Sequence, residues 1–362
     1  MTGWVCREPA GVKTGGGTMS AISAAGEPSQ ALGRKIAGLL PAAAAMAYPF
    51  LLQAFHSVVA QPASAVRPAL AAALLVLAFA MPLSGLAFAC WQAGWPQGLQ
   101  SDLRARRLAY ASIAAPPLFV FVGVAPGLVG LHVPEAALWI GLWALAGLYA
   151  WSGRGVLAPA QTSQPAGTWR VAHGAAAALI ACFVLFHLTN HLSGLAGPGV
   201  HAAIMKTGRT VYRAAAVEPV LILLLLFQVA SGLRLAWRWS GLRSDAFRIF
   251  QIGSGAYLAA FILTHLNSAL ISARTVHKIE TDWAWASGAP AGLIQDAWNI
   301  RLLPHYALGV FFIAGHLSSG LRVVMLAHGV RASVANRIWS AGLVAGALVS
   351  AAIICALCGV RI

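Results

Sequence analysis

The sequence has few charged residues, and very few of these are acidic. Only 9% of its 362 residues are charged, and 9 Asp and Glu residues stand against 24 Lys and Arg residues. A soluble domain normally has about 25% charged residues, so this deficit excludes an ordinary soluble fold. Because 59% of the residues are hydrophobic, the composition is that of an integral membrane protein with several spanning helices.

Cysteines and nucleotide-binding motifs are also scarce. The five cysteines are too scattered for a disulfide framework, and we expect Cys355 and Cys358, at the end of the last apolar run, to be inert packing residues. No phosphate-binding loop, dinucleotide fingerprint, zinc spacing or nucleophile elbow occurs. The sequence therefore shows no means of binding a flavin, holding iron-sulfur clusters or oxidising a substrate by itself.

What remains is apolar sequence with basic loops. Residues 1–33 are rich in Gly, Ser and Ala, and we interpret them as a flexible tail. Nine apolar runs follow, most of them near the roughly 20 residues that cross a bilayer. They are 36–60, 68–91, 108–131, 137–152, 172–195, 216–236, 249–273, 304–327 and 338–360.

The basic residues lie mostly in short loops between these runs. The net charge of +15 therefore favours contact with lipid headgroups, and we expect no nucleic-acid partner. A cytoplasmic N-terminus places twice as many of the 24 Lys and Arg residues inside as outside. We therefore expect an integral protein of a bacterial inner membrane with its N-terminus in the cytoplasm and its C-terminus outside.

The runs form two units with similar endings. Ser-Gly-Leu at 84–86 in the second run recurs at 231–233 in the sixth and at 319–321 in the eighth. We predict an all-α membrane helical bundle of about nine helices with a degenerate internal duplication, made of a four-helix unit, 34–153, and a five-helix unit, 171–362. Met81 and Trp143 occupy the repeat positions of Gln228 and His316, so we expect no cofactor in the first unit. Ordinary close helix packing also produces such small-residue endings.

Three histidines lie deep inside apolar runs of the second unit: His187, His265 and His316. A polar ring in lipid costs free energy unless it has a partner, so such residues mark function, although a hydrogen-bonded packing role is the alternative. His187 and His265 each lie about 16 residues into runs of the same direction, so their rings reach similar depth. Two facing imidazoles are the axial ligands of a six-coordinate haem iron. His191, one turn further, is an alternative ligand, or a hydrogen-bond donor to a haem propionate or a quinone.

The second unit also carries motifs of a known family. They are Phe-His-Leu at 186–188, Glu-Pro at 218–219, Gln-x3-Gly-Leu from 228, the stretch 248–265 and His-x3-Gly-Leu from 316. In these features about half of the chain resembles the membrane cytochrome b subunit of succinate dehydrogenases and fumarate reductases, of the five-helix kind. The resemblance implies that His187 and His265 bind the iron of one haem b and that His316 is one ligand of an inner haem.

One position departs from the family pattern. Gln228 stands where the family has its second-helix histidine, and an amide is a poor haem ligand. We therefore predict an inner site without haem, in which the Gln228 amide and the His316 ring satisfy each other by a hydrogen bond.

The resemblance also implies partners and a quinone site. On the outer side, Glu218 with Arg209 and Arg213 is expected to accept protons from a quinol, and an ordinary surface pair of Arg and Glu is the alternative. The inner loops 91–107 and 238–248 are expected to dock flavoprotein and iron-sulfur subunits. We interpret the remaining histidines as interfacial: His56, His132, His173, His201, His277, His305 and His328.

The predicted function is that of a membrane anchor and b-type haem electron-transfer subunit, which links a flavin and iron-sulfur dehydrogenase to the quinone pool. The alternative is a haem-free transporter or scaffold that kept the cytochrome fold.

Overall fold

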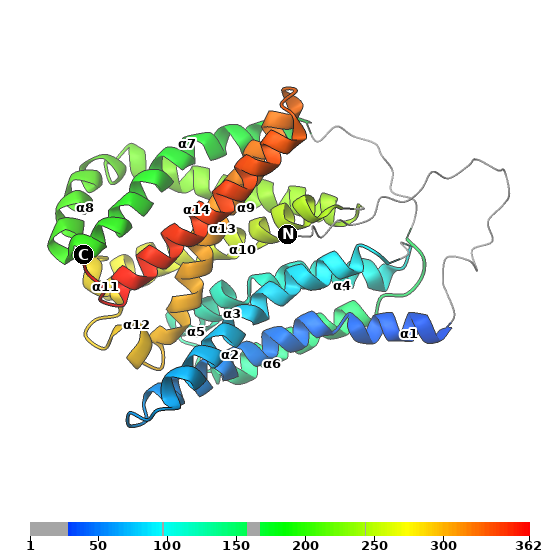
Figure 1. Ribbon diagram of the computed structural model, residues 1–362, viewed down its shortest axis with the longest axis horizontal. Coiled ribbons are helices and arrows are strands. Elements are labelled where there is room, and N and C mark those ends of the chain that lie inside the picture. The colour runs from blue at the N-terminus through cyan, green and yellow to red at the C-terminus, as the bar shows by residue number, and fades with distance from the viewer. Residues whose placement is uncertain (1–27, 96–97, 158–166, 243) are drawn as a thin grey trace.

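The described chain is a bundle of helices. The computed structural model describes residues 28–95, 98–157, 167–242 and 244–362, and these ranges contain no strand. The first unit forms α1 (Pro28–Ala37), α2 (Leu40–Val59), α3 (Arg67–Gln92), α4 (Gln100–Ile113), α5 (Ala115–Leu128) and α6 (Glu135–Trp151). The second unit forms α7 (Gly167–Leu192), η1 (Ser193–Ala196), α8 (Pro198–Tyr212), α9 (Val217–Ser240), α10 (Ala246–Leu266), η2 (Asn267–His277), α11 (Trp283–Ser287), α12 (Gly292–Gln295), η3 (Asn299–Arg301), α13 (Leu302–Ala327) and α14 (Ala332–Leu357), as Figure 1 shows.

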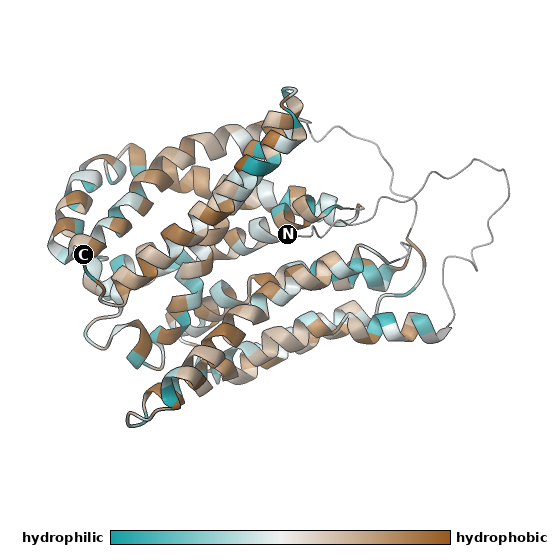
Figure 2. Ribbon diagram, in the orientation of Figure 1, coloured by the Kyte–Doolittle hydropathy of each residue, from teal (hydrophilic) through white to brown (hydrophobic). Residues whose placement is uncertain are grey.

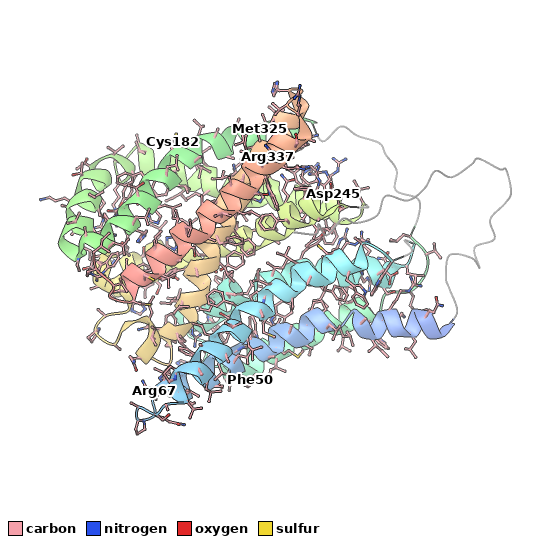
Figure 3. The ribbon with its side chains drawn as sticks, viewed as in Figure 1. Phe50, Arg67, Cys182, Asp245, Met325 and Arg337 are labelled. Atoms are coloured by element: carbon pink, nitrogen blue, oxygen red, sulfur yellow. The ribbon has the colours of Figure 1, made fainter. Side chains whose placement is uncertain are left out.

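Seven stretches of the described chain are long and apolar enough to cross a membrane. They are Gln30–Val59, Arg67–Gln92, Gly167–Ala196, Val217–Ser240, Ala246–His277, Asn299–Ala327 and Ala332–Leu357. Each coincides with a predicted run, which confirms the prediction of an all-helical integral membrane protein. Apolar residues cover these helices (Figure 2), and side chains such as Phe50 on α2 and Cys182 on α7 are exposed on their surface, where a bilayer would surround them (Figure 3).

The third and fourth predicted runs differ from single spanning helices. In place of one helix over 108–131, the chain forms α4 and α5, which are bent by 69°. Pro116 and Pro117 lie in the first turn of α5, and because proline lacks an N–H and its ring clashes with the preceding turn, α4 ends at Ile113. The Thr264 hydroxyl of α10 donates to the Pro117 carbonyl at 3.0 Å and holds the bend in place. The fourth run forms α6, which has 17 residues.

The predicted N-terminal tail is too long. Residues 1–27 lie outside the described residues, but residues 28–33 belong to α1, so the tail assignment is wrong for them. The reason is a tertiary contact, because Arg34 forms an ion pair with Asp102 of α4 at 3.3 Å.

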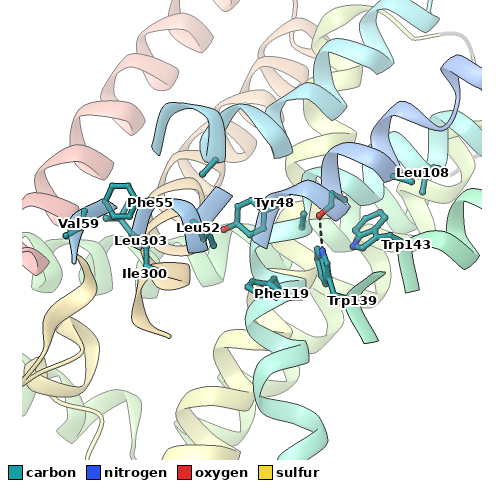
Figure 4. Close-up of a cluster of buried hydrophobic side chains, with 14 of the residues drawn as sticks. Tyr48, Leu52, Phe55, Val59, Leu108, Phe119, Trp139, Trp143, Ile300 and Leu303 are labelled. Carbon is teal, nitrogen blue, oxygen red and sulfur yellow. Dashed lines mark hydrogen bonds between the residues drawn. The ribbon is translucent and has the colours of Figure 1, made fainter. Parts of the chain in front are cut away.

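The core of the first unit is built around α2. Tyr48, Leu52 and Phe55 repeat at intervals of four and three residues, which places them on one buried face of the helix. The Trp139 ring of α6 packs beside them, and its Nε1 donates to the Ala45 carbonyl at 2.9 Å (Figure 4). The start of α13 reaches the same core, so the two units share buried contacts.

A buried arginine joins the two units. Arg106 of α4 is 7% exposed and donates to the carbonyls of Ser240 and Leu242, both at 3.2 Å, while the Arg107 guanidinium lies 3.5 Å from the centre of the Trp237 ring. A buried charge is costly unless it is hydrogen-bonded, which these carbonyls achieve. The prediction that the loop 91–107 is a docking surface is therefore wrong for Arg106, which makes an internal contact.

Candidate functional site

One cavity of about 1160 Å³ runs through the second unit between α7, α9, α10 and α13. Typical ligand pockets measure about 300–1,000 Å³, so this cavity has room for a large ligand. Arg170 and Arg248 line one end, here called the Arg170 end, and Arg209 and Arg274 line the other, the Arg209 end. Apolar side chains form most of the wall between them.

A pair of imidazoles lies across the cavity toward the Arg209 end. The ring centroids of His187 and His265 are 6.0 Å apart, and the ring planes meet at 73°. Neither ring makes a hydrogen bond within the described residues. Phe183 stacks beside His187 at 5.5 Å and Phe261 beside His265 at 5.6 Å. The predicted match in depth is confirmed for these two residues, and it is His187 rather than His191 that faces His265.

A second pair lies toward the Arg170 end, and sequence reasoning missed it. His173 and His316 have ring centroids 6.4 Å apart and planes at 82°. The Nδ1 atom of His173 lies 2.8 Å from the Ser231 hydroxyl, and that of His316 lies 3.0 Å from the Ser254 hydroxyl. The predicted bond between His316 and Gln228 is wrong, because the Gln228 amide donates to the His173 backbone carbonyl at 2.9 Å. His173 is likewise no interfacial residue, since it lines the cavity.

Helical geometry explains how α7 serves both pairs. His173 and His187 are 14 residues apart, which places them on the same face of α7 and about 21 Å apart along it. Glycines leave room beside the rings of His173 and His316. A Cβ at Gly232 would lie 3.3 Å from Cε1 of His173, and one at Gly255 would lie 3.1 Å from Cε1 of His316.

The ring spacings suit a metal held between each pair. Two imidazole nitrogens that each bind one metal at about 2.0 Å place their ring centroids about 6 Å apart. The serine bonds at Nδ1 leave Nε2 of His173 and His316 as the ligating nitrogens and fix the ring orientation. No cluster of three or more metal-binding side chains occurs within the described ranges. The donor set is therefore two separate imidazole pairs, which fit the axial positions of haem iron.

The predicted quinone-side residues lie at the Arg209 end, but they pair differently. Glu218 binds Arg274 of η2, with oxygen-to-nitrogen distances of 2.5 and 3.4 Å. Arg209 donates to the Thr281 carbonyl at 2.9 Å and Arg213 to its hydroxyl at 3.0 Å. Burial, and then the nearby Arg209 and Arg274, lower the pKa of Arg213. Glu218 is thus engaged with a residue that the sequence did not suggest.

A short helix brings another histidine to this end. Gly197 has a φ of 118°, which suits glycine, and the turn there leads the chain from α7 into α8. His201, Met205 and Gly208 follow at intervals of four and three residues and form the buried face of α8. His201 is 1% exposed and His305 is 2% exposed, so the interfacial interpretation is wrong for both. The intervals after Gly197 and Pro198 were a signal for α8 that sequence reasoning left unused.

The other four histidines lie near or beyond helix ends, where they were expected: His56, His132, His277 and His328.

No family model matches this chain, and no curated protein or solved structure does so either.

Proposed function

We propose that the protein is a membrane-bound b-type cytochrome that exchanges electrons between a partner dehydrogenase and the quinone pool. The observation that carries the proposal is that one apolar cavity holds two imidazole pairs, and the two rings of each pair face each other at spacings of 6.0 and 6.4 Å. Two imidazoles are too few ligands for a free metal ion. They complete the coordination of an iron that a porphyrin already holds by four nitrogens.

In this proposal His187 and His265 bind the iron of an outer haem b, which supplies one-electron redox chemistry when bound. Apolar side chains of the cavity wall, such as Leu221, Leu225 and Ile262, cover the porphyrin and exclude water. The stacked phenylalanines hold both rings across the cavity.

His173 and His316 bind a second, inner haem b in the same proposal. The Nδ1–H groups of His173 and His316 donate to the hydroxyls of Ser231 and Ser254, which hold each ring and would leave Nε2 toward the iron. This ligand set differs from the one that the resemblance implied, because α7 would supply a ligand to both sites and Gln228 to neither.

The two sites allow electrons to cross the bundle. They lie about 21 Å apart along α7, so one is near the Arg170 end and the other near the Arg209 end. Exposed basic residues lie at the start of α7, with Arg170, and at the start of α14, with Arg331 and Arg337, and they suit acidic surfaces of flavoprotein and iron-sulfur subunits. We therefore place the Arg170 end in the cytoplasm and the quinone site at the Arg209 end.

The topology follows from this orientation. If the bent pair α4–α5 and the short α6 each cross the membrane, the seven spanning stretches become nine. Nine spans put the two termini on opposite sides of a bacterial inner membrane. With the Arg170 end in the cytoplasm, the N-terminus is inside and the C-terminus is outside. The internal duplication stays a prediction.

A spectrum of the purified protein tests the proposal. The dithionite-reduced minus oxidised difference spectrum of the detergent-solubilised chain should show the α-band of a low-spin b haem. A short-chain hydroquinone should produce the same band without dithionite. Protein that is folded and monodisperse but contains no haem would refute the proposal and favour a haem-free transporter or scaffold.

A further inference from the structure

A group of polar side chains lies beyond the outer imidazole pair at the Arg209 end of the cavity. Asn190 and His201 are 4% and 1% exposed, and both line the cavity together with His191. The His191 ring centroid lies 4.6 Å from that of His187 and 5.4 Å from that of His201. These three residues, the Asn190 cluster, therefore begin one ring contact away from the outer pair.

The hydrogen bonds of the cluster are incomplete. Asn190 Nδ2 lies 3.2 Å from His201 Nε2. Burial and the nearby Arg209 lower the pKa of His201 against the opposing effect of Asp282, so its ring is neutral and carries one proton. If Asn190 donates to Nε2, that proton is on Nδ1. Three buried atoms then have no partner within the described residues, namely Nδ1 of His201, Nδ1 of His191 and Oδ1 of Asn190.

These atoms define the chemistry of a ligand. Buried polar atoms are normally hydrogen-bonded, and here a donor at His201 Nδ1 and an acceptor at Asn190 Oδ1 are both left without a partner within the described residues. A ligand with two hydroxyl groups satisfies both, because the oxygen of one accepts a hydrogen bond from His201 Nδ1 while the proton of the other is donated to Asn190 Oδ1. A carboxylate or phosphate is less suitable, because the Asn190 oxygen would repel it. Such an anion has a better site at Arg213, which forms no ion pair within the described chain.

We propose that the Asn190 cluster binds the head group of a hydroquinone, one of whose hydroxyl groups donates to Asn190 Oδ1 while the oxygen of the other accepts from His201 Nδ1. Met205 and Trp285 line the same end and supply apolar surface for the ring. This inference rests on the proposed function, which needs a quinone site beside the outer pair. Oxidation of a bound hydroquinone to a quinone would release two electrons and two protons, and a haem held by His187 and His265 would supply the one-electron acceptor.

Two substitutions of His201 separate its contact with the ligand from its contact with Asn190. An Asn side chain places its amide near the Nδ1 position of histidine, whereas a Gln side chain reaches the Nε2 position. His201→Asn therefore keeps a donor toward the ligand, and His201→Gln keeps only the contact with Asn190. Cys182→Ser, on the exposed surface of α7, is the matched control.

The test uses the full-length purified chain and menadiol as the probe. The concentration of menadiol that gives half the maximal rate of haem reduction should rise about tenfold in His201→Gln, as expected for one lost hydrogen bond. It should stay within about threefold of wild type in His201→Asn and be unchanged in Cys182→Ser. The dissociation constant for menadione should likewise rise most in His201→Gln, less in His201→Asn and not in Cys182→Ser. It is measured by quenching of tryptophan fluorescence, which requires no haem.

Two results would overturn the inference. If His201→Gln binds menadione and oxidises menadiol like wild type, water alone satisfies the cluster. If both His201 variants are weakened equally, the ligand does not use the Nδ1 donor. Absence of haem from the wild type instead counts against the proposed function, while the menadione dissociation constants still decide the role of the cluster.

Discussion

Replacement of His173 by alanine should remove one of two haems and leave the other. His173 and His187 lie about 21 Å apart on α7, so their sites share no ligand and their losses should be independent. The substitution removes one hydrogen bond, in which His173 donates to the Ser231 hydroxyl, and that hydroxyl keeps its own donation to the Phe227 carbonyl at 2.6 Å. The cost in folding free energy should therefore be only about 1 kcal/mol, and the protein should still fold.

The assay is the amount of haem per chain, measured as the pyridine haemochrome and normalised to amino-acid analysis. Wild type should contain two haems and His173→Ala one, with half of the α-band absorbance. Gln228→Leu is the control and should retain two, because the Gln228 amide donates to the backbone carbonyl of His173 and not to its ring. Gln228→His should add none, because both inner ligands are already supplied by His173 and His316. Two haems in His173→Ala would refute the inner ligand assignment.

Three further outcomes follow from packing and burial. Gly255→Ala should shift the potential of the inner haem, because its Cβ would lie 3.1 Å from the His316 ring, whereas Gly320→Ala meets no atom within 4 Å and should leave redox titrations unchanged. Arg106→Met should lower the free energy of unfolding in SDS titrations by roughly 2–3 kcal/mol, because two carbonyls lose a charged donor. Burial lowers the pKa of His201 in the folded protein, so protonation of this residue favours the unfolded state. The folded protein therefore keeps its full stability above the unfolded pKa of about 6.5 and loses stability as the pH falls below that value. Melting temperatures should therefore decrease more in wild type than in His201→Asn between pH 7.5 and 5.5.

Properties that depend on local sequence were predictable. The seven spanning stretches coincide with predicted apolar runs, because length and hydrophobicity are read directly from neighbouring residues. The depth of His187 and His265 followed from counting residues along two helices of the same direction. Both results required no knowledge of how the helices pack.

Properties that depend on packing between helices were not predictable. His173 is only a few residues into α7, and nothing in its neighbours indicates that His316 of α13 lies opposite it. Arg106 looked like a loop residue because its acceptors, the carbonyls of Ser240 and Leu242, are more than 130 residues away in sequence. The adjacent prolines Pro116 and Pro117 were a signal for the bend that the prediction of one run over 108–131 left unused, and the hydrogen bond from Thr264 that holds the bend had no local signal.

The most direct measurement is the low-temperature EPR spectrum of the oxidised wild-type protein together with its haem content. Ferric haem with two imidazole ligands is low-spin, so the facing pairs His187 with His265 and His173 with His316 predict two low-spin signals and two haems per chain. A single low-spin signal that survives His173→Ala would restrict the cytochrome to the outer site. A high-spin ferric signal in the intact protein, or folded protein with no haem, would contradict ligation by the imidazole pairs.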